Sequence, residues 1–403
     1  MMKTAVVIAN NLLKIDSPAA PIERELLEEL SRKGIKIIAF CSSQGVLTSP
    51  SSNYETIIIK ESRLWRYFFA AVKLVLPDLV NLPDYHLWTC GKRMEKAIKK
   101  RIKTEENIDY IHSFSFECSC HLVACNIHSS FNIPWVATFF DSWTDEPSRK
   151  FVTKFFRRKD QKYERIVAES SSTIVHNNPG IADLWNKRYG IDISNKTRII
   201  PLNVDFGKLR KTPLEPQNKE LLTISHIGTF YKHRDASVFI NAISLFVSRY
   251  PELRNRLRIN FIGTVLKSDI QIIQNNNLSD IFFMLGRLPV EECNKYYRET
   301  DIFLATAGLP FERITFPSKI IKYFYYERPI LGITPSDTVL SIELRQAGHS
   351  FYTPDNLDGI AEYIYHAITN YKSLCSFDKD YWERFSTESV GNHYLNIIDN
   401  LQL

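Results

Sequence analysis

The sequence has no uncharged apolar run of eighteen residues, the length that a membrane-spanning helix needs. Its N-terminal stretch, MMKTAVVIANNLLKIDSPAAP, ends its apolar run too early for a secretory signal with a small-residue cleavage site. The seven cysteines are odd in number and scattered from Cys41 to Cys375, which does not suit the disulfide framework of a small secreted domain. These absences predict a cytoplasmic protein with reduced thiols.

Positive charge is in small excess, because the net charge is only +6 over 403 residues. No zinc, recognition-helix or RNA-binding signature accompanies the basic residues, so we expect no nucleic-acid partner. The basic residues nevertheless cluster in KRMEKAIKKRIK (92–103) and RKFVTKFFRRKDQKYER (149–165). Each cluster suits either an anionic surface or an ordinary solvated helix face.

What the chain does have is a regular alternation of short β-branched runs and longer helical patterns. TAVVIA, PIERELLEELSRKG and IKIIAFC open it in the order strand, helix, strand. This rhythm is typical of β-α-β units and predicts a doubly wound parallel sheet wrapped by helices. It continues to about residue 205, and a second cycle of the same kind begins at about residue 221.

We therefore expect two Rossmann-like α/β domains, each with its own core, which a chain of this length allows. The predicted boundaries are 1–205 for the N-terminal domain and 221–375 for the C-terminal domain. The segment 206–220 is rich in charge and proline and has no hydrophobic period, as expected of a linker. The amphipathic tail 376–403 is expected to be helical and to pack on either domain.

The stretch HIGTFYKHRD places its cations between a strand and a helix. Gly228 ends the strand, and Arg234 lies in the turn before a helix that begins near residue 236. A cation beside the positive end of a helix is unfavourable unless an anion is bound between them, so the turn predicts a phosphate site that Gly228 lets the backbone approach. The alternative is a simple ion pair of Arg234 with Asp235 or another surface carboxylate.

A second cation occupies an equivalent place in ITFPSKIIKYFYYERPILGI. Pro317 and Ser318 are start signals of a helix, and Lys319 lies in its first turn. The carboxyl ends of parallel strands meet at one edge of a sheet, where ligands bind. Two loops with the same unusual charge therefore favour one shared anion.

These residues resemble the family 4 (group 1) retaining glycosyltransferases of the GT-B fold, and the resemblance covers nearly the whole chain. It rests on the glycine at Gly228 with a cation six positions later at Arg234, and on PSK and RPIL further along. The arginine that commonly follows the glycine is replaced by Thr229, so Lys319 is the second cation that the resemblance implies. It implies a nucleotide-sugar in the C-terminal domain and an acceptor in the N-terminal domain.

Further residues are carried over by the same resemblance. Leu285, Gly286 and Arg287, in MLGRLP, correspond to a loop that touches the nucleobase through its backbone. IPWVATFFDSW resembles the strand that ends in an acceptor-side loop, where Asp141 is kept but the preceding histidine is Phe140.

The sequence departs from the family at the paired glutamates, whose places are taken by Ile314 and Lys322. Glu312, two positions away, is the candidate for the first of them. SPAAP stands where glycines usually follow the first strand. His112 is predicted to end a strand in IDYIHSF, where it either has a functional role or is merely hydrogen-bonded. Asp141 and His112 are candidates for positioning the acceptor or the sugar.

The reaction implied is a retaining, metal-independent transfer in which Arg234 and Lys319 stabilise the leaving diphosphate, with the nucleotide-sugar as co-substrate and no cofactor. The expected acceptor is a glycan or a lipid-linked sugar in cell-surface polysaccharide biosynthesis. The alternative is a catalytically inactive GT-B partner subunit or scaffold, because the paired glutamates are missing.

Two other patterns have competing interpretations. Cys118, His121, Cys125 and His128 share one helical face, but such positions span about 15 Å of a rigid helix, so a buried face is favoured over a zinc site. SRLWRYFFAAVKLVLP (62–77) and the cluster at 149–165 mix cations with aromatic residues. They suit either a helix packing its aromatics inward or attachment to the inner membrane surface.

Overall fold

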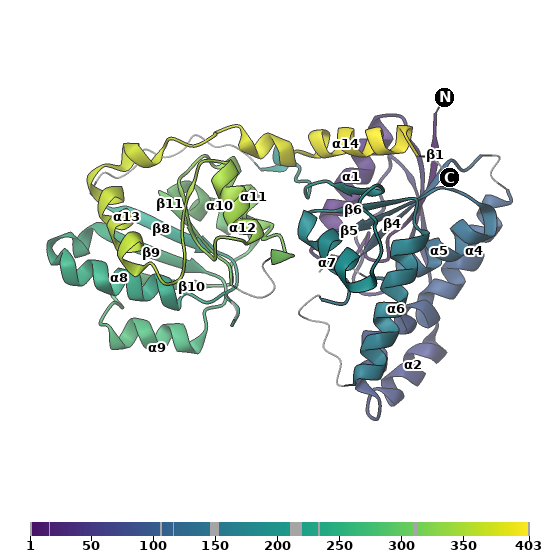
Figure 1. The fold of residues 1–403 in the computed structure, drawn as a ribbon, viewed down its shortest axis with the longest axis horizontal. Coiled ribbons are helices and arrows are strands. Elements are labelled where there is room, and N and C mark those ends of the chain that lie inside the picture. The colour runs from purple at the N-terminus through teal and green to yellow at the C-terminus, as the bar shows by residue number, and fades with distance from the viewer. Residues whose placement is uncertain are drawn as a thin grey trace. The chain divides into compact units, whose positions relative to one another are not determined.

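The computed structural model describes residues 2–15, 17–104, 107–115, 117–145, 153–209, 220–232, 234–308 and 313–401. The chain forms two compact units, Met1–Asp205 with Arg384–Leu403, and Phe206–Glu383. Each unit is a parallel sheet flanked by helices (Figure 1). The prediction of two α/β domains with Rossmann-like parallel sheets is confirmed.

The first unit contains a sheet of seven parallel strands in the order β3-β2-β1-β4-β5-β6-β7. The strands are β1 (Thr4–Ile8), β2 (Lys36–Ser42), β3 (Glu55–Ile59), β4 (Tyr110–Ser115), β5 (Trp135–Phe139), β6 (Thr173–His176) and β7 (Thr197–Ile199). The central strands β1, β4 and β5 are buried throughout, as expected of a parallel sheet that helices cover on both faces. The strand order reverses between β1 and β4, so the carboxyl ends of these two strands flank the switch point of the sheet.

The helices of this unit follow the predicted alternation in most places. They are α1 (Ala19–Arg32), α2 (Arg63–Val72), α3 (Pro83–His86), α4 (Lys92–Ile102), α5 (Ser119–Phe131), α6 (Lys154–Ser170), α7 (Pro179–Tyr189) and α14 (Thr387–Asp399). A 3₁₀ turn, η1 (Pro77–Asn81), follows α2. Proline opens α7 and a left-handed glycine at 190 ends it, which is the usual asymmetry of helix ends.

The C-terminal helix α14 belongs to the first unit, where it packs against α1. A Cβ atom at Gly391 would lie only 2.6 Å from the Glu29 side chain, so glycine allows the two helices to approach closely. The Tyr394 hydroxyl lies 3.1 Å from the Thr138 hydroxyl on β5. Of the predicted tail, the part from Arg384 onward belongs to the N-terminal unit, whereas residues 376–383 belong to the second unit.

The second unit contains six parallel strands in the order β10-β9-β8-β11-β12-β13. They are β8 (Leu222–Ile227), β9 (Leu257–Ile262), β10 (Phe282–Gly286), β11 (Ile302–Thr306), β12 (Ile330–Ile333) and β13 (Ser350–Tyr352). The helices are α8 (Ser237–Arg249), α9 (Lys267–Asn275), α10 (Val290–Glu299), α11 (Lys319–Tyr325), α12 (Val339–Gln346) and α13 (Leu357–Thr369). Here the order reverses between β8 and β11.

Each unit buries its own apolar side chains; in the second, α8, α9 and α13 enclose a core with β8, β9 and β11. Among the described residues, no helix combines the length and the apolar character needed to cross a membrane.

Candidate functional site

Three glycines lie at the carboxyl ends of neighbouring strands in the second unit. Gly228, Gly263 and Gly286 follow or end β8, β9 and β10, and all three have positive φ angles. A Cβ atom at Gly263 would lie 2.3 Å from the Gly228 carbonyl oxygen, so the first two turns can touch only as glycine backbone. The Gly263 amide also donates to the Gly286 carbonyl over 2.7 Å. The carboxyl ends of these three strands therefore form an edge of glycine backbone without side chains, which a ligand can approach.

Lys319, at the start of α11, reaches this edge. Its Nζ lies 2.8 Å from Nε2 of His226, and a Cβ atom at Gly228 would be 3.7 Å from the same Nζ. The two loops in which the sequence predicted anion-binding cations, one following β8 and one preceding α11, thus meet beside Gly228.

His226 holds the Lys319 ammonium in this place. The His226 side chain is buried in β8, and its Nδ1 lies 3.0 Å from the Leu304 carbonyl oxygen. A carbonyl can only accept, so Nδ1 carries the proton and Nε2 accepts from Lys319. Burial, the nearby Lys319 charge and the more distant Arg234 charge keep the pKa of His226 well below its ordinary value. His226 is therefore neutral, which is the form that can accept from an ammonium.

Arg234 contributes charge to the same region. Its backbone amide donates to the Tyr231 carbonyl over 2.9 Å, and its guanidinium carbon is 4.9 Å from the centre of the Tyr231 ring. The Arg234 charge is the smallest of the causes that lower the pKa of His226, so Arg234 lies within electrostatic reach of His226.

Two carboxylates lie at the start of α8, the helix end beside which the sequence predicts a bound anion. The Asp235 carboxylate accepts from the Ser237 amide and hydroxyl over 3.0 and 2.6 Å. Asp269 accepts from the Ala236 amide over 3.1 Å. Because these carboxylates satisfy the first donors of α8 and offset its dipole, the glycine edge and the cations remain as the anion-binding features.

The other residues predicted for the donor side lie around this edge. Thr229 follows Gly228 directly, and the Pro317 carbonyl accepts from the Ile320 amide in the first turn of α11, next to Ser318. Leu285 lies in β10, and Arg287 follows it. The Arg287 Nε donates to the hydroxyl of Thr264 over 3.2 Å, which ties the end of β10 to the end of β9. Glu312 lies outside the described residues.

A polar cluster lies at the switch point of the first unit and was not predicted from the sequence. Asn10 follows β1 and Glu117 follows β4, and the Asn10 amide donates to Glu117 Oε2 over 3.2 Å. The same oxygen is 2.9 Å from His86 Nδ1, and Lys14 Nζ is 4.0 Å from Glu117 Oε1. Although burial opposes ionisation, His86, Lys14 and Asn10 together lower the pKa of Glu117. The cluster thus holds a charged carboxylate where parallel sheets bind ligands.

A second carboxyl, Glu23 of α1, lies behind this cluster. Only 1% of Glu23 is exposed, and its Oε2 has no hydrogen-bond partner within the described part of the chain. Burial and then the Glu117 charge raise the pKa of Glu23 to about 8. A neutral and an ionised carboxyl therefore adjoin one another, and such pairs are common at functional sites.

The two candidates for the acceptor side differ in their surroundings. His112 does not end its strand, as the sequence had suggested; it is the third residue of β4 and only 1% exposed. Its Nε2 is 2.9 Å from the Thr138 hydroxyl, and burial lowers its pKa to about 3. These contacts account for His112 as a hydrogen-bonded core residue. Asp141 is half-buried and follows β5, where Ser115 accepts from the Phe140 amide over 3.2 Å.

The cysteine and histidine face of α5 is engaged in separate contacts. His121 Nδ1 lies 2.8 Å from the Ser113 hydroxyl, whereas His128 Nδ1 lies 2.7 Å from the Ile133 carbonyl. No group of three His, Cys, Asp or Glu residues in the described ranges has a metal-binding arrangement.

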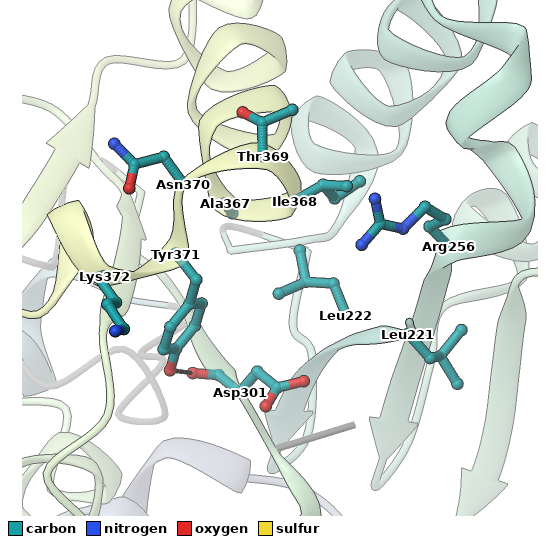
Figure 2. Close-up of a pocket in the computed structure, with 10 residues that line it drawn as sticks. All are labelled: Leu221, Leu222, Arg256, Asp301, Ala367, Ile368, Thr369, Asn370, Tyr371 and Lys372. Atoms are coloured by element: carbon teal, nitrogen blue, oxygen red, sulfur yellow. Dashed lines mark hydrogen bonds between the residues drawn. The ribbon is translucent and has the colours of Figure 1, made fainter. Parts of the chain in front are cut away.

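A cavity of about 300 Å³ opens at the opposite edge of the second sheet (Figure 2). It lies at the amino ends of β8, β9 and β11, where Leu222, Arg256 and Asp301 point toward it. The Tyr371 hydroxyl donates to the Asp301 carbonyl over 2.7 Å and closes one side. Since ligands of parallel sheets bind at carboxyl ends, this cavity is separate from the candidate donor site.

Comparison with known proteins agrees with this geometry. Residues 24–208 match the model of Glycosyltransferase Family 4. A little under half of the chain is thus similar to this family of glycosyltransferases. No curated protein is similar to it in sequence at a significant level.

The chain shares its fold with several solved structures. Sucrose-phosphate synthase from Thermosynechococcus elongatus is 13% identical, with a TM-score of 0.65 and 99% of each chain covered. Anabaena HepE in complex with UDP and glucose is 10% identical, with a TM-score of 0.64 over 99% of this chain and 100% of that one. The lipopolysaccharide outer core galactosyltransferase WaaB is also 10% identical, with a TM-score of 0.65 over 99% of each chain.

Proposed function

We propose that this protein is a glycosyltransferase that binds the diphosphate of a nucleotide-sugar at the carboxyl edge of the second unit's sheet, with Lys319 and Arg234 as its cations. The observation that carries the proposal is the Lys319 ammonium, held by His226 beside the bare backbone of Gly228. HepE, which shares the fold, has been solved with UDP and glucose, and this supports a uridine diphosphate sugar as the first donor to test. Leu285, Gly286 and Arg287 are proposed to lie near the base.

The proposed transfer is retaining and independent of metal. The bond between the sugar's anomeric carbon and the phosphate oxygen breaks, and the acceptor hydroxyl oxygen bonds to that carbon on the same face. Its proton passes to the departing phosphate. Lys319 and Arg234 stabilise the charge that develops on the diphosphate more strongly in the transition state than in the ground state.

We further propose that the first unit binds the acceptor, with the polar cluster at its switch point and Asp141 as contacts. The ionised Glu117, with Asn10 and His86 beside it, supplies hydrogen-bond partners for sugar hydroxyls. The proposed acceptor is a lipid-linked glycan in cell-surface polysaccharide biosynthesis, with the enzyme in the cytoplasm at the inner membrane surface. The shared fold with the lipopolysaccharide galactosyltransferase WaaB supports this choice.

The test is release of the nucleoside diphosphate from a panel of nucleotide-sugars, measured with membrane lipid extract as acceptor and with a chelator present. We expect turnover with one donor, reduced on the order of 10²-fold by Lys319→Ala or Arg234→Ala. Lys295→Ala is the matched control, because this exposed lysine lies on α10 and pairs with Glu299. Full turnover by Lys319→Ala would contradict the assigned role.

A second candidate function is that of an inactive partner subunit. It is favoured by Ile314 and Lys322 at the places of the paired glutamates and by Phe140 in place of a histidine. Turnover with any donor would exclude it.

A further inference from the structure

An exposed apolar surface extends over α2 and the residues that follow it. Within α2, only Phe69 is buried. Leu74 and Val75, just beyond the helix, are 88% and 80% exposed, and Leu64 is 74% exposed. Tyr67, Phe68 and Leu76 are exposed as well. This answers the question left open by the sequence, because most of these side chains point outward rather than into the core.

The first turn of α6 extends the same surface. Phe155 is 71% exposed. Just before it, the amide and hydroxyl of Thr153 donate to Asp78 Oδ2 over 2.7 and 2.9 Å, and Asp78 lies in η1, directly after the apolar segment. Lys159 is 2.9 Å from Asp84, one α6 turn further on. These bonds hold α6 to η1 and α3 at one end of the first unit, and η1 in turn packs against α2 (Figure 1).

The charge exposed on this surface is of one sign. Residues 62–77 contain three cations, Arg63, Arg66 and Lys73, and no acidic residue. On α6, Lys154, Arg157, Arg158 and Lys162 are exposed.

Two of the three acidic residues of α6 face the other way. Asp160 is buried and accepts from the Trp143 indole over 2.9 Å, and the buried Glu164 accepts from the Thr144 amide over 3.0 Å. The third, Glu169, is exposed near the other end of the helix, where it pairs with Arg165. The first half of α6 thus has its acid inside and most of its cations outside. We name the exposed residues 63–76 together with those of 154–162 the α2–α6 surface.

We infer that the α2–α6 surface docks on a membrane containing anionic lipids. Apolar side chains ringed by cations match an interface of acyl chains beneath negative headgroups, and stable attachment takes both kinds of contact. A second copy of the same surface would bring cations against cations, which opposes self-association. The inference rests on the proposed function for its purpose, since a docked enzyme would meet a lipid-linked acceptor.

Co-sedimentation with vesicles tests the inference without any sugar transfer. We expect the protein to bind vesicles rich in phosphatidylglycerol, to bind phosphatidylcholine vesicles much less, and to be released by salt. Arg157→Glu with Arg158→Glu is expected to weaken binding by at least about tenfold, because the loss of each basic residue near an anionic surface weakens binding about fivefold. Leu74→Ser with Val75→Ser should weaken it as well.

Matched controls lie elsewhere on the same unit. Lys96→Glu with Lys100→Glu removes two exposed charges of α4, and Val46→Ser removes an exposed apolar side chain from a loop. These variants are expected to bind vesicles as the wild type does. Equal binding by all variants, or no binding to anionic vesicles, would overturn the inference. So would concentration-dependent dimers that the α2–α6 variants abolish.

The inference and the proposed function fail in distinguishable ways. The α2–α6 variants should still bind the nucleotide and retain donor turnover with a detergent-dispersed acceptor. If that turnover persists while vesicle binding is absent, the docking surface alone is wrong. If vesicle binding is intact and no nucleotide binds, the donor assignment alone is wrong.

Discussion

At the scale of single residues, the proposed donor site depends on the pair formed by Lys319 and His226. The lysine side chain is flexible and does not by itself hold its ammonium in one place. The neutral His226, which the Leu304 carbonyl orients, accepts a hydrogen bond from the Lys319 ammonium and so fixes its position. His226 is thus a positioning residue, acting on the ligand through Lys319.

Replacing His226 gives a prediction that separates positioning from packing. His226→Leu removes the acceptor of the ammonium, and His226→Gln keeps one. A hydrogen bond to a charged group contributes about 1.5–3 kcal/mol, so we expect nucleotide affinity to fall about tenfold or more in His226→Leu. Calorimetry of nucleotide binding should show partial rescue in His226→Gln. Loss of affinity in both variants to the same degree, with equal thermal stability, would argue against positioning by hydrogen bonding.

Glu23 predicts a particular pH dependence of stability. The folded pKa of Glu23, about 8, is above its ordinary value of 4.5, so the unfolded chain loses this proton first as the pH rises. Its contribution to stability is complete below about pH 4.5 and is lost as the pH rises toward about 8. From about pH 6.5 to 8 this loss amounts to up to about 2 kcal/mol. The melting temperature of Glu23→Gln should fall less over this interval than that of the wild type. Parallel profiles of melting temperature against pH for the two proteins would contradict the assignment.

The role of a single residue could be predicted from the sequence where its immediate neighbours define its place in a strand or helix. Gly228 and Lys319 stand at a strand end and a helix start, and such places can be read from neighbouring letters. His226 was missed because its partner is 93 positions away, and Asn10 because Glu117 is 107 away. Position 226 had one signal, a polar residue two places before a strand-end glycine, which puts both on the same face of the strand.

At the scale of elements, the contact of the β8 and β9 turns sets the form of the donor edge. Both turns are glycine, and the Gly263 Cα faces the Gly228 carbonyl too closely for any side chain.

Alanine at Gly263 should therefore be far more damaging than alanine at Gly286. Both glycines have positive φ, but a Cβ atom at Gly286 meets nothing within 4 Å among the described residues. We expect Gly286→Ala to lower the free energy of unfolding by about 1–2 kcal/mol, the cost of the left-handed backbone alone. Gly263→Ala should cost more and also weaken nucleotide binding. Equal melting temperatures for the two variants would show that the β8 and β9 turns can move apart at no cost in free energy, which would contradict this prediction.

The elements with a strong hydrophobic period were predicted closely. The helix expected over VEECNKYYRE spans Val290–Glu299, and PGIADLWNKRYG gave α7 between its proline and glycine signals. Two edge strands were missed, because β13 has only three residues and β3 is half-exposed on both faces. The helices α9 and α13 were also not predicted, although α13 packs against α8 over a regular apolar face.

At the scale of the whole molecule, buried neutral histidines couple folding to acid. Burial lowers the pKa of His112, His121, His176 and His349 to about 3, and that of His226 is also well below its ordinary 6.5. Both units contain such residues. Below about pH 6.5 the unfolded chain therefore binds protons that the folded chain does not bind, which lowers the free energy of unfolding.

We expect the melting temperature of both units to fall as the pH is lowered from about 7 to about 4.5. Five carboxyls with raised pKa values act in the opposite direction and are expected to reduce this fall without reversing it: Glu23 (about 8), Asp301 (about 6), Glu61, Glu164 and Asp269. Circular dichroism across this range measures the effect, and His112→Gln should reduce it in the first unit. A melting temperature that stays constant over the range would contradict it.

The two-unit architecture followed from the alternation of strands and helices, and the GT-B resemblance followed from Gly228, Arg234 and the PSK motif. The identity of the donor does not follow from these features, because base and sugar are selected by the shape of a site that glycine backbone and distant side chains build together.

Isothermal titration of UDP, GDP and CDP into the wild type, Lys319→Ala and Lys295→Ala tests the central claim most directly. The account predicts that one of these nucleotides binds the wild type and Lys295→Ala equally, and binds Lys319→Ala at least about tenfold more weakly, because a charge-assisted contact is lost. Absence of binding by all three nucleotides, or equal affinity for Lys319→Ala, would contradict it.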